Sequence, residues 1–196
     1  MMQTATLNLH RFEPASRANG PGLRAVVWVQ GCALGCPGCF NPDSHAFDGG
    51  NRWPVERLAE KILAQKDNLE GLTISGGEPA HQHRALAQLL SLIRQQSSLS
   101  VLVFSGYNLE ELRLMPGSQA FLQYIDVLIA GRYETSRRVA SGLIGSANKA
   151  IHLLSDRYTV ADLQKVPQAE IILSPEGDIL LSGIDPLRWQ EDHGDS

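Results

Sequence analysis

All three cysteines of the 196-residue chain, Cys32, Cys36 and Cys39, lie within one eight-residue stretch. Thiolates are soft, negatively charged ligands that bind iron and zinc. An odd number of closely spaced cysteines argues against a disulfide framework and favours a metal site. The plainer alternative is three small core residues, but their spacing fits neither one helix face nor the alternation of a strand. This stretch is therefore predicted to hold a metal group.

The number of thiolates narrows the kind of metal group. A structural zinc ion usually has four protein ligands, so His10 or His45 would have to complete a zinc site. A [4Fe–4S] cluster is ordinarily held by four cysteines, and three would leave one iron open to another ligand. Glycines at 31, 35 and 38 would let the backbone wrap closely round a cluster. We favour the cluster with an open iron and keep zinc as the alternative.

A second chemical motif, Gly76-Gly77-Glu78-Pro79, follows a predicted strand. A glycine pair at the end of a strand allows a ligand to approach the backbone. The carboxylate of Glu78 can accept charge-assisted hydrogen bonds from a ligand ammonium group. A simple turn explains the same residues when they are considered alone, so the motif gains its meaning beside the cysteines.

The elements that must position these residues alternate between strand-like and helix-like segments, which predicts βα units around a parallel sheet. Buried strands are expected at 24–30, 71–75, 100–104 and 126–130, and helices at 54–65, 83–96 and 109–112. In open α/β sheets and barrels, ligands gather at the carboxyl ends of the strands. The segments that follow the four strands are the cysteine loop, 75–79, 105–108 and 131–134. We expect them to converge on one site.

The predicted fold class is α/β, a partial (βα)6-type open barrel of parallel strands over residues 1–160. Residues 133–147 are expected to form an irregular loop, with a further strand at 151–154. A C-terminal extension, 161–196, is expected to pack on the barrel with a β-hairpin formed by 170–173 and 178–181. The tail from about residue 190 is polar and is expected to be frayed.

Composition excludes several classes of protein. The chain is 43% hydrophobic and 19% charged, and its net charge is −4. It has no run of Lys and Arg of the kind that marks a nucleic-acid binder. It also has no apolar stretch near the roughly 18 residues that span a membrane, and its N-terminus does not resemble a signal peptide. We therefore expect a cytoplasmic protein with neither a nucleic-acid nor a membrane partner.

Cys32-Ala-Leu-Gly-Cys36-Pro-Gly-Cys39 resembles the CxxxCxxC motif of radical S-adenosylmethionine enzymes, and Ser75–Pro79 resembles their GGE motif. Further segments are similar to the activating enzymes of glycyl radical enzymes, and above all to the activase of anaerobic ribonucleotide reductase. These segments are 19–24, 29–42, 104–112, 125–131 and 145–148. The resemblance runs in order from about residue 7 to about residue 158.

This resemblance implies two cofactors, a [4Fe–4S] cluster on the three cysteines and S-adenosylmethionine. The amino and carboxylate groups of S-adenosylmethionine would chelate the open iron. One electron, from a reduced flavodoxin or a ferredoxin-type donor, would then break the C5′–S bond and yield a 5′-deoxyadenosyl radical. In an activase that radical takes a hydrogen atom from a glycyl radical enzyme, the expected partner.

The resemblance also implies roles for individual residues. Glu78 would take the methionyl ammonium group, with Gly76 and Gly77 beside the cofactor. The Ser105 hydroxyl would bind the cofactor, and Arg132 would pair with its carboxylate. A third residue, Asn41, would order the cluster loop. For these last three, a turn hydroxyl, a solvated charge and a turn former are equally good interpretations.

Three features depart from the activase pattern and keep other functions open. The pattern's Asp-Gly is Ala130-Gly131 here, its Asn-Gln is Asn148-Lys149, and the tail from about residue 162 extends past the minimal activase. One alternative is a radical enzyme that acts directly on a peptide or small molecule, with the C-terminal hairpin helping to form its pocket. Another is a zinc- or cluster-binding scaffold without catalysis. The absence of further cysteines excludes an auxiliary cluster and favours the activase.

Overall fold

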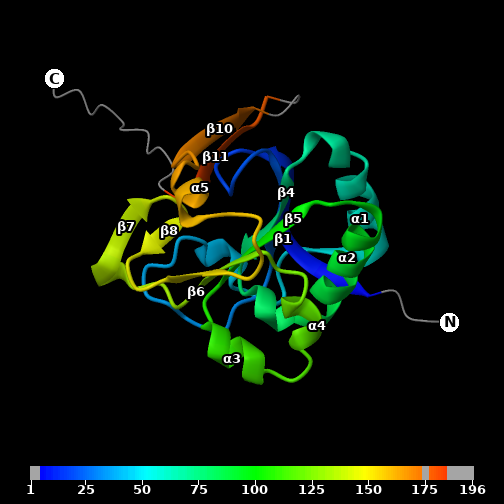
Figure 1. The fold of residues 1–196 in the computed structure, drawn as a ribbon. Helices are drawn as coiled ribbons and strands as arrows, with labels where there is room; N and C mark the ends of the chain where they lie inside the picture. Colours follow the sequence, from blue (N-terminus) through cyan, green and yellow to red (C-terminus); the bar gives the residue numbers. More distant parts are fainter. Residues whose placement is uncertain (1–4, 174–176, 185–196) are drawn as a thin grey trace.

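The computed structural model describes residues 5–173 and 177–184, and a seven-stranded sheet with the order β3-β1-β2-β4-β5-β6-β9 forms its centre (Figure 1). Strands β2, β4, β5 and β6 are parallel, whereas β1, β3 and β9 run antiparallel to their neighbours at the two edges. The bounds of the sheet strands are β1 Thr6–Ser16, β2 Arg24–Val29, β3 Asn51–Pro54, β4 Gly71–Gly76, β5 Ser100–Ser105, β6 Val127–Ala130 and β9 Ala150–Leu153.

One face of this sheet is covered by helices. The α-helices of the described residues are α1 Val55–Leu63, α2 His83–Gln96, α3 Leu109–Leu114, α4 Gln119–Leu122 and α5 Val160–Gln164. Helix α2 places Leu86, Leu89, Leu90 and Ile93 on a single buried face, as the 3.6-residue period requires. Together with α1 and α4, that face packs on alternate residues of the strands and forms the main hydrophobic core.

The opposite face of the sheet carries a second, smaller core. Val101 and Val103 of β5 belong to the main core, whereas Leu102 between them belongs to the second, because successive strand side chains point to opposite faces. On that second face the sheet packs against Leu163 and Val166, in and just after α5. The segment that follows the sheet therefore helps to bury the face that α1 and α2 leave uncovered.

Two hairpins flank this second face. Strands β7 Arg138–Ser141 and β8 Ile144–Ser146 form one, and β10 Ala169–Leu173 and β11 Ile179–Gly183 form the other. The C-terminal hairpin is anchored to the loop after β1, because Glu170 accepts hydrogen bonds from the Ser16 hydroxyl and from the backbone N–H of Arg17.

The prediction of a mixed α/β fold with parallel central strands and a small C-terminal hairpin is confirmed. The antiparallel strands β1 and β3 were not predicted, because β1 mixes charged and apolar residues without strict alternation. The prediction of an irregular loop over 133–147 is wrong for β7 and β8, two short strands joined at Gly142, whose φ is +56°. The predicted frayed tail lies outside the described residues. Within the described part, no helix is long and apolar enough to cross a bilayer.

Candidate active site

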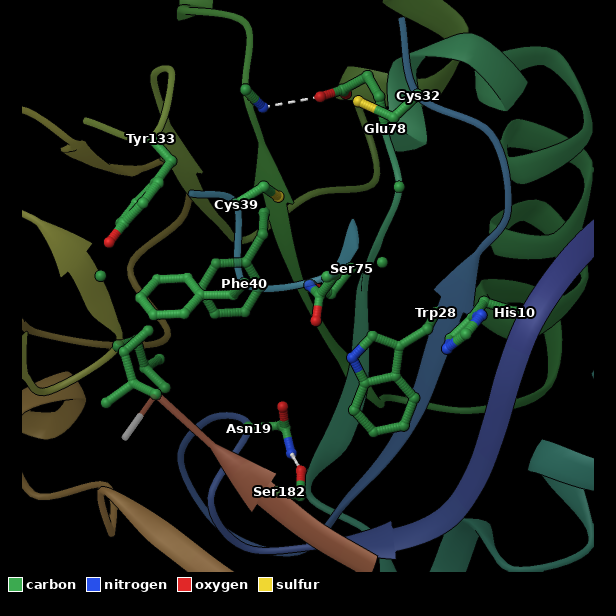
Figure 2. A pocket seen from close by; sticks show the side chains of 18 of the residues that line it. His10, Asn19, Trp28, Cys32, Cys39, Phe40, Ser75, Glu78, Tyr133 and Ser182 are labelled. Carbon is green, nitrogen blue, oxygen red and sulfur yellow. Dashed lines mark hydrogen bonds between the residues drawn. The ribbon is translucent and has the colours of Figure 1, made fainter. Parts of the chain in front are cut away.

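A cavity of about 370 Å³ lies at the carboxyl ends of the parallel strands. Eight of the nine predicted site residues line it, namely Cys32, Cys36, Cys39, Asn41, Gly76, Gly77, Glu78 and Ser105. Figure 2 shows Glu78 beside Cys32 at one end of the cavity and Trp28, Asn19 and Ser182 toward the other. The expected convergence of the segments that follow β2, β4 and β5 is therefore present.

The cysteine loop is held to a frame of backbone hydrogen bonds. The N–H of Gly31 donates to the carbonyl of Ser44 at 2.8 Å, and the N–H of Cys32 donates to that of His45 at 2.9 Å. The three thiols are free and half-buried. Three glycines in the loop have positive φ, +101° at Gly31, +60° at Gly35 and +68° at Gly38. These conformations let the chain fold back sharply at three points and bring all three thiols to one cavity.

The charge environment of Cys32 favours binding of a cation. Burial raises the pKa of the Cys32 thiol, and the nearby negative charges of Glu78, Cys39 and Cys36 raise it further. A metal ion removes this penalty, because a coordinating thiol is deprotonated by the metal charge. In the part of the chain that the structure describes, no three His, Cys, Asp or Glu side chains are arranged to hold one ion.

The glycine pair after β4 lies directly against the strand that leads into the cysteine loop. Gly77 donates its N–H to the carbonyl of Val29 at 2.8 Å, and Glu78 donates to that of Gly31 at 2.9 Å. A Cβ on Gly77 would lie 2.5 Å from the carbonyl oxygen of Gly31, and one on Gly76 would lie 2.5 Å from that of Val29. Only glycine permits this approach, which joins the two motifs into one wall of the cavity.

Glu78 is 1% exposed, and most of its carboxylate is already hydrogen-bonded. Its Oε1 accepts from the N–H of Ala80 and from the Ser105 hydroxyl, both at 2.8 Å, and its Oε2 accepts from the N–H of Gly106 at 2.7 Å. A carboxylate offers about four acceptor positions, so one remains on Oε2. Burial raises the pKa of Glu78 and these hydrogen bonds oppose that rise. A ligand ammonium group would offset the cost of the buried charge.

The remaining predicted residues are used in different ways. Ser105 gives its hydroxyl hydrogen to Glu78 and accepts from the N–H of Tyr107 at 3.1 Å, so it orients the carboxylate. Asn41 lines the cavity, and its carbonyl accepts from the N–H and the hydroxyl of Ser44, which holds the turn after the cysteines.

Arg132 lies outside the cavity lining. Its guanidinium donates to the carbonyl of Gly106 at 2.6 Å and to both carboxylate oxygens of Glu111, and it lies 4.7 Å from the ring centroid of Tyr107. These neighbours already bind the guanidinium group. The predicted pairing of Arg132 with a cofactor carboxylate therefore stays a prediction.

Several lining residues were not predicted. Lys149 is a half-buried cation at the cysteine end, and its only signal in the sequence was its departure from the activase pattern. Trp28 points into the cavity because it alternates on β2 with core residues on either side. Phe40 and Tyr133 form an aromatic pair with centroids 4.6 Å apart. The C-terminal hairpin was expected to help form a pocket in the peptide or small-molecule alternative, but Ser182 itself was not predicted. Asn19 donates a hydrogen bond of 2.8 Å to its hydroxyl.

These features fit the groups that the resemblance implies. Three thiols face a cavity large enough for more than one ion, which suits a cluster better than a single zinc ion. The free acceptor position of Glu78 suits the ammonium group of an amino acid. Ala130, which stands where the activase pattern has Asp, is buried in the main core and is not part of the cavity lining.

Comparisons with known proteins agree with this geometry. Residues 18–152 match the model of the 4Fe-4S single cluster domain. An anaerobic ribonucleoside-triphosphate reductase-activating protein of Vibrio cholerae is 36% identical over 155 residues, which are 74% of this chain and 97% of that protein. The protein of the same name from Pasteurella multocida is 34% identical over 154 residues, 74% of this chain and 97% of its own length. Its counterpart in Escherichia coli K12 is 28% identical over 156 residues, 76% of this chain and 99% of that protein.

The match to this domain and the similarity to activating proteins imply a [4Fe–4S] cluster and S-adenosylmethionine as the cofactors. With the cysteine loop, the glycine–glutamate motif and a match over most of its length, the chain belongs to the 4Fe-4S single cluster domain family, in the radical S-adenosylmethionine activase group.

Proposed function

We propose that this chain activates a glycyl radical enzyme of the anaerobic ribonucleotide reductase type. The observation that carries the proposal is the meeting of the three cysteines and Glu78 at one end of a single cavity. The names of its relatives give the partner, since they are activating proteins of anaerobic ribonucleoside-triphosphate reductases. The electron donor in this proposal is a reduced flavodoxin or ferredoxin-type protein, and the location is the cytoplasm.

In this proposal Cys32, Cys36 and Cys39 hold the cluster and leave one iron open. When bound, the cluster and S-adenosylmethionine supply the 5′-deoxyadenosyl radical, and the hard chemistry belongs to them. The free acceptor position on Glu78 Oε2 orients the methionyl ammonium group, while Ser105 and Gly106 hold that carboxylate in place.

The rest of the cavity wall limits the access of water. Its apolar side chains include Leu34, Phe104 and Leu143, together with the ring pair Phe40 and Tyr133. A reactive radical needs such a wall, because exclusion of water prevents side reactions.

We also propose that the sheet is a partial barrel whose open side admits the partner, with residues 1–160 as the radical domain and 161–196 as an extension. The packing of Leu163 and Val166 on the second sheet face supports this division. Direct modification of a peptide or small molecule is the second candidate, and it is favoured by Leu181 and Ser182 of the hairpin, which narrow the cavity. The third candidate is a non-catalytic scaffold that binds zinc or a cluster. It does not explain why the carboxylate of Glu78 is buried beside the cysteines.

The test begins with anaerobic reconstitution of the full chain, which should bind about four irons and four sulfides. Incubation with S-adenosylmethionine and a strong reductant should then release 5′-deoxyadenosine. Addition of an anaerobic ribonucleotide reductase should produce a glycyl radical signal in electron paramagnetic resonance. Release of 5′-deoxyadenosine without that signal would favour the second candidate, and a colourless protein with one zinc ion would exclude both radical functions.

A further inference from the structure

Lys149 is tied to the carboxyl end of β6. Its backbone N–H donates to the carbonyl of Ser146 at 3.1 Å, and its Nζ donates to the carbonyl of Gly131 at 2.6 Å. The side chain of the preceding residue, Asn148, donates to the carbonyl of Arg132 at 2.8 Å. The bond to Gly131 holds the amine itself at the strand end, and the other two bonds hold the turn that carries it. Lys149 lines the cavity.

Its ammonium group has no carboxylate partner among the residues that the structure describes. An ammonium carries three donors, and the bond to Gly131 uses one. Burial lowers the pKa of Lys149, and the negative charges of Cys36, Glu78 and Cys39 oppose that effect. A half-buried cation with two unused donors is therefore placed to bind a negatively charged group in the cavity.

The other charged groups nearby are already occupied. Glu78 has three of its acceptor positions filled and carries the wrong sign to bind an anion. Arg132 is bound to Glu111, with the shorter contact at 2.9 Å. Arg11, an arginine that does line the cavity, lies on β1 and is 3.9 Å from Glu13. Among the described residues that line the cavity, Lys149 is therefore the cation placed to bind a new anion near the cysteines.

We propose that Lys149 binds the carboxylate of the methionyl group of S-adenosylmethionine, while Glu78 binds the ammonium group of the same moiety. This inference rests on the proposed function. The methionyl group carries a positive ammonium group and a negative carboxylate. At its cysteine end the cavity has one residue of opposite charge for each, Glu78 and Lys149. Lys149, rather than Arg132, would then bind the carboxylate. Lys149 is also a position at which this chain departs from the activase pattern.

The experiment uses the full, cluster-loaded chain in the oxidised state and measures ligand dissociation constants by equilibrium dialysis. The ligands are S-adenosylmethionine and its decarboxylated form, which lacks the carboxylate. Lys149→Met should weaken binding of S-adenosylmethionine at least about tenfold, the loss of one charge-assisted hydrogen bond. The same variant should bind the decarboxylated ligand within about twofold of wild type. Lys149→Arg should recover most of the affinity because it restores the charge.

The matched control is Lys165→Met, which removes an exposed lysine whose nearest charge is Asp162 at 3.4 Å. It should leave both dissociation constants unchanged. Equal weakening of the two ligands by Lys149→Met would overturn the proposal, as would unchanged binding of S-adenosylmethionine. A larger effect of Arg132→Met than of Lys149→Met would return the carboxylate to Arg132.

A third measurement separates the carboxylate from the cluster as the anion that Lys149 binds. The midpoint potential of the cluster is determined without S-adenosylmethionine in wild type and Lys149→Met. Loss of this positive charge should lower the potential of the variant to some extent, because Lys149 lies near Cys36 and Cys39, and the affinity for S-adenosylmethionine should fall with it. A shifted potential with unchanged ligand affinity would assign Lys149 to the cluster and refute the proposal. Failure of the wild-type chain to bind a four-iron cluster or to cleave S-adenosylmethionine would refute the proposed function itself, whatever the variants do.

Discussion

Replacement of Glu78 by Gln should separate the function of this carboxylate from its effect on folding. The side chain is almost fully buried and accepts hydrogen bonds from Ala80, Ser105 and Gly106, so an amide of the same shape keeps most of its packing. The change removes the negative charge that we assign to the methionyl ammonium group. A charged hydrogen bond contributes about 1.5–3 kcal/mol, so affinity for S-adenosylmethionine should fall about 10- to 100-fold.

The same change should remove the part of the pH dependence of stability that Glu78 causes in the cluster-free protein. Burial, as the largest cause, raises the pKa of Glu78 above its ordinary value of 4.5 on folding. The stability contributed by the protonated form is present below the unfolded pKa and is lost as pH rises through the folded pKa. Wild type has therefore lost this contribution to stability once the carboxyl of the folded protein is ionised. The amide of the variant does not titrate, so its stability does not change in this way. The unfolding free energy of wild type should therefore fall relative to that of the variant as pH rises from below 4.5 to neutral.

Two measurements check this reasoning, equilibrium dialysis with the cluster-loaded protein and urea unfolding of the cluster-free protein at several pH values. Glu110→Gln, an exposed change on α3, is the matched control and should alter neither. Wild-type affinity of Glu78→Gln for S-adenosylmethionine would refute the role assigned to this carboxylate. A difference in unfolding free energy between wild type and variant that does not change with pH would show that the buried charge is fully compensated by its neighbours.

Three further changes test other parts of the structure. Cys36→Ala should reduce bound iron well below four per chain and abolish release of 5′-deoxyadenosine, and retained cleavage would show that the cluster assignment is wrong. Gly77→Ala places a Cβ 2.5 Å from the Gly31 carbonyl oxygen, so it should displace the cysteine loop and lower both the iron content and the melting temperature. Arg24→Met removes a fully buried guanidinium and its hydrogen bonds, so urea unfolding should show a loss of about 3–5 kcal/mol, whereas the exposed change Arg113→Met should have little effect.

The parallel strands at the centre of the sheet were predictable because each is marked by a local pattern of apolar residues in the sequence. Residues 101–104 are apolar, include two β-branched valines and are followed by a turn, and the structure places β5 there at Ser100–Ser105. The antiparallel edges were not predictable in the same way. The partners of β1 are β2 and β3, and this pairing depends on contacts between residues up to 48 positions apart rather than on a local pattern.

The sequence by itself determined the chemistry at the cysteine end. Three thiolates at fixed spacing and a Gly-Gly-Glu turn at the end of the next parallel strand must meet, because neighbouring parallel strands end at one edge of a sheet. Which charged side chain faces the cavity was decided by the tertiary structure. Arg132 and Lys149 both follow strands near the site, yet Glu111 on α3 binds the first, and the carbonyl of Gly131 holds the second in the cavity. Such competition between partners depends on distances across the fold, so no spacing along the chain could reveal it.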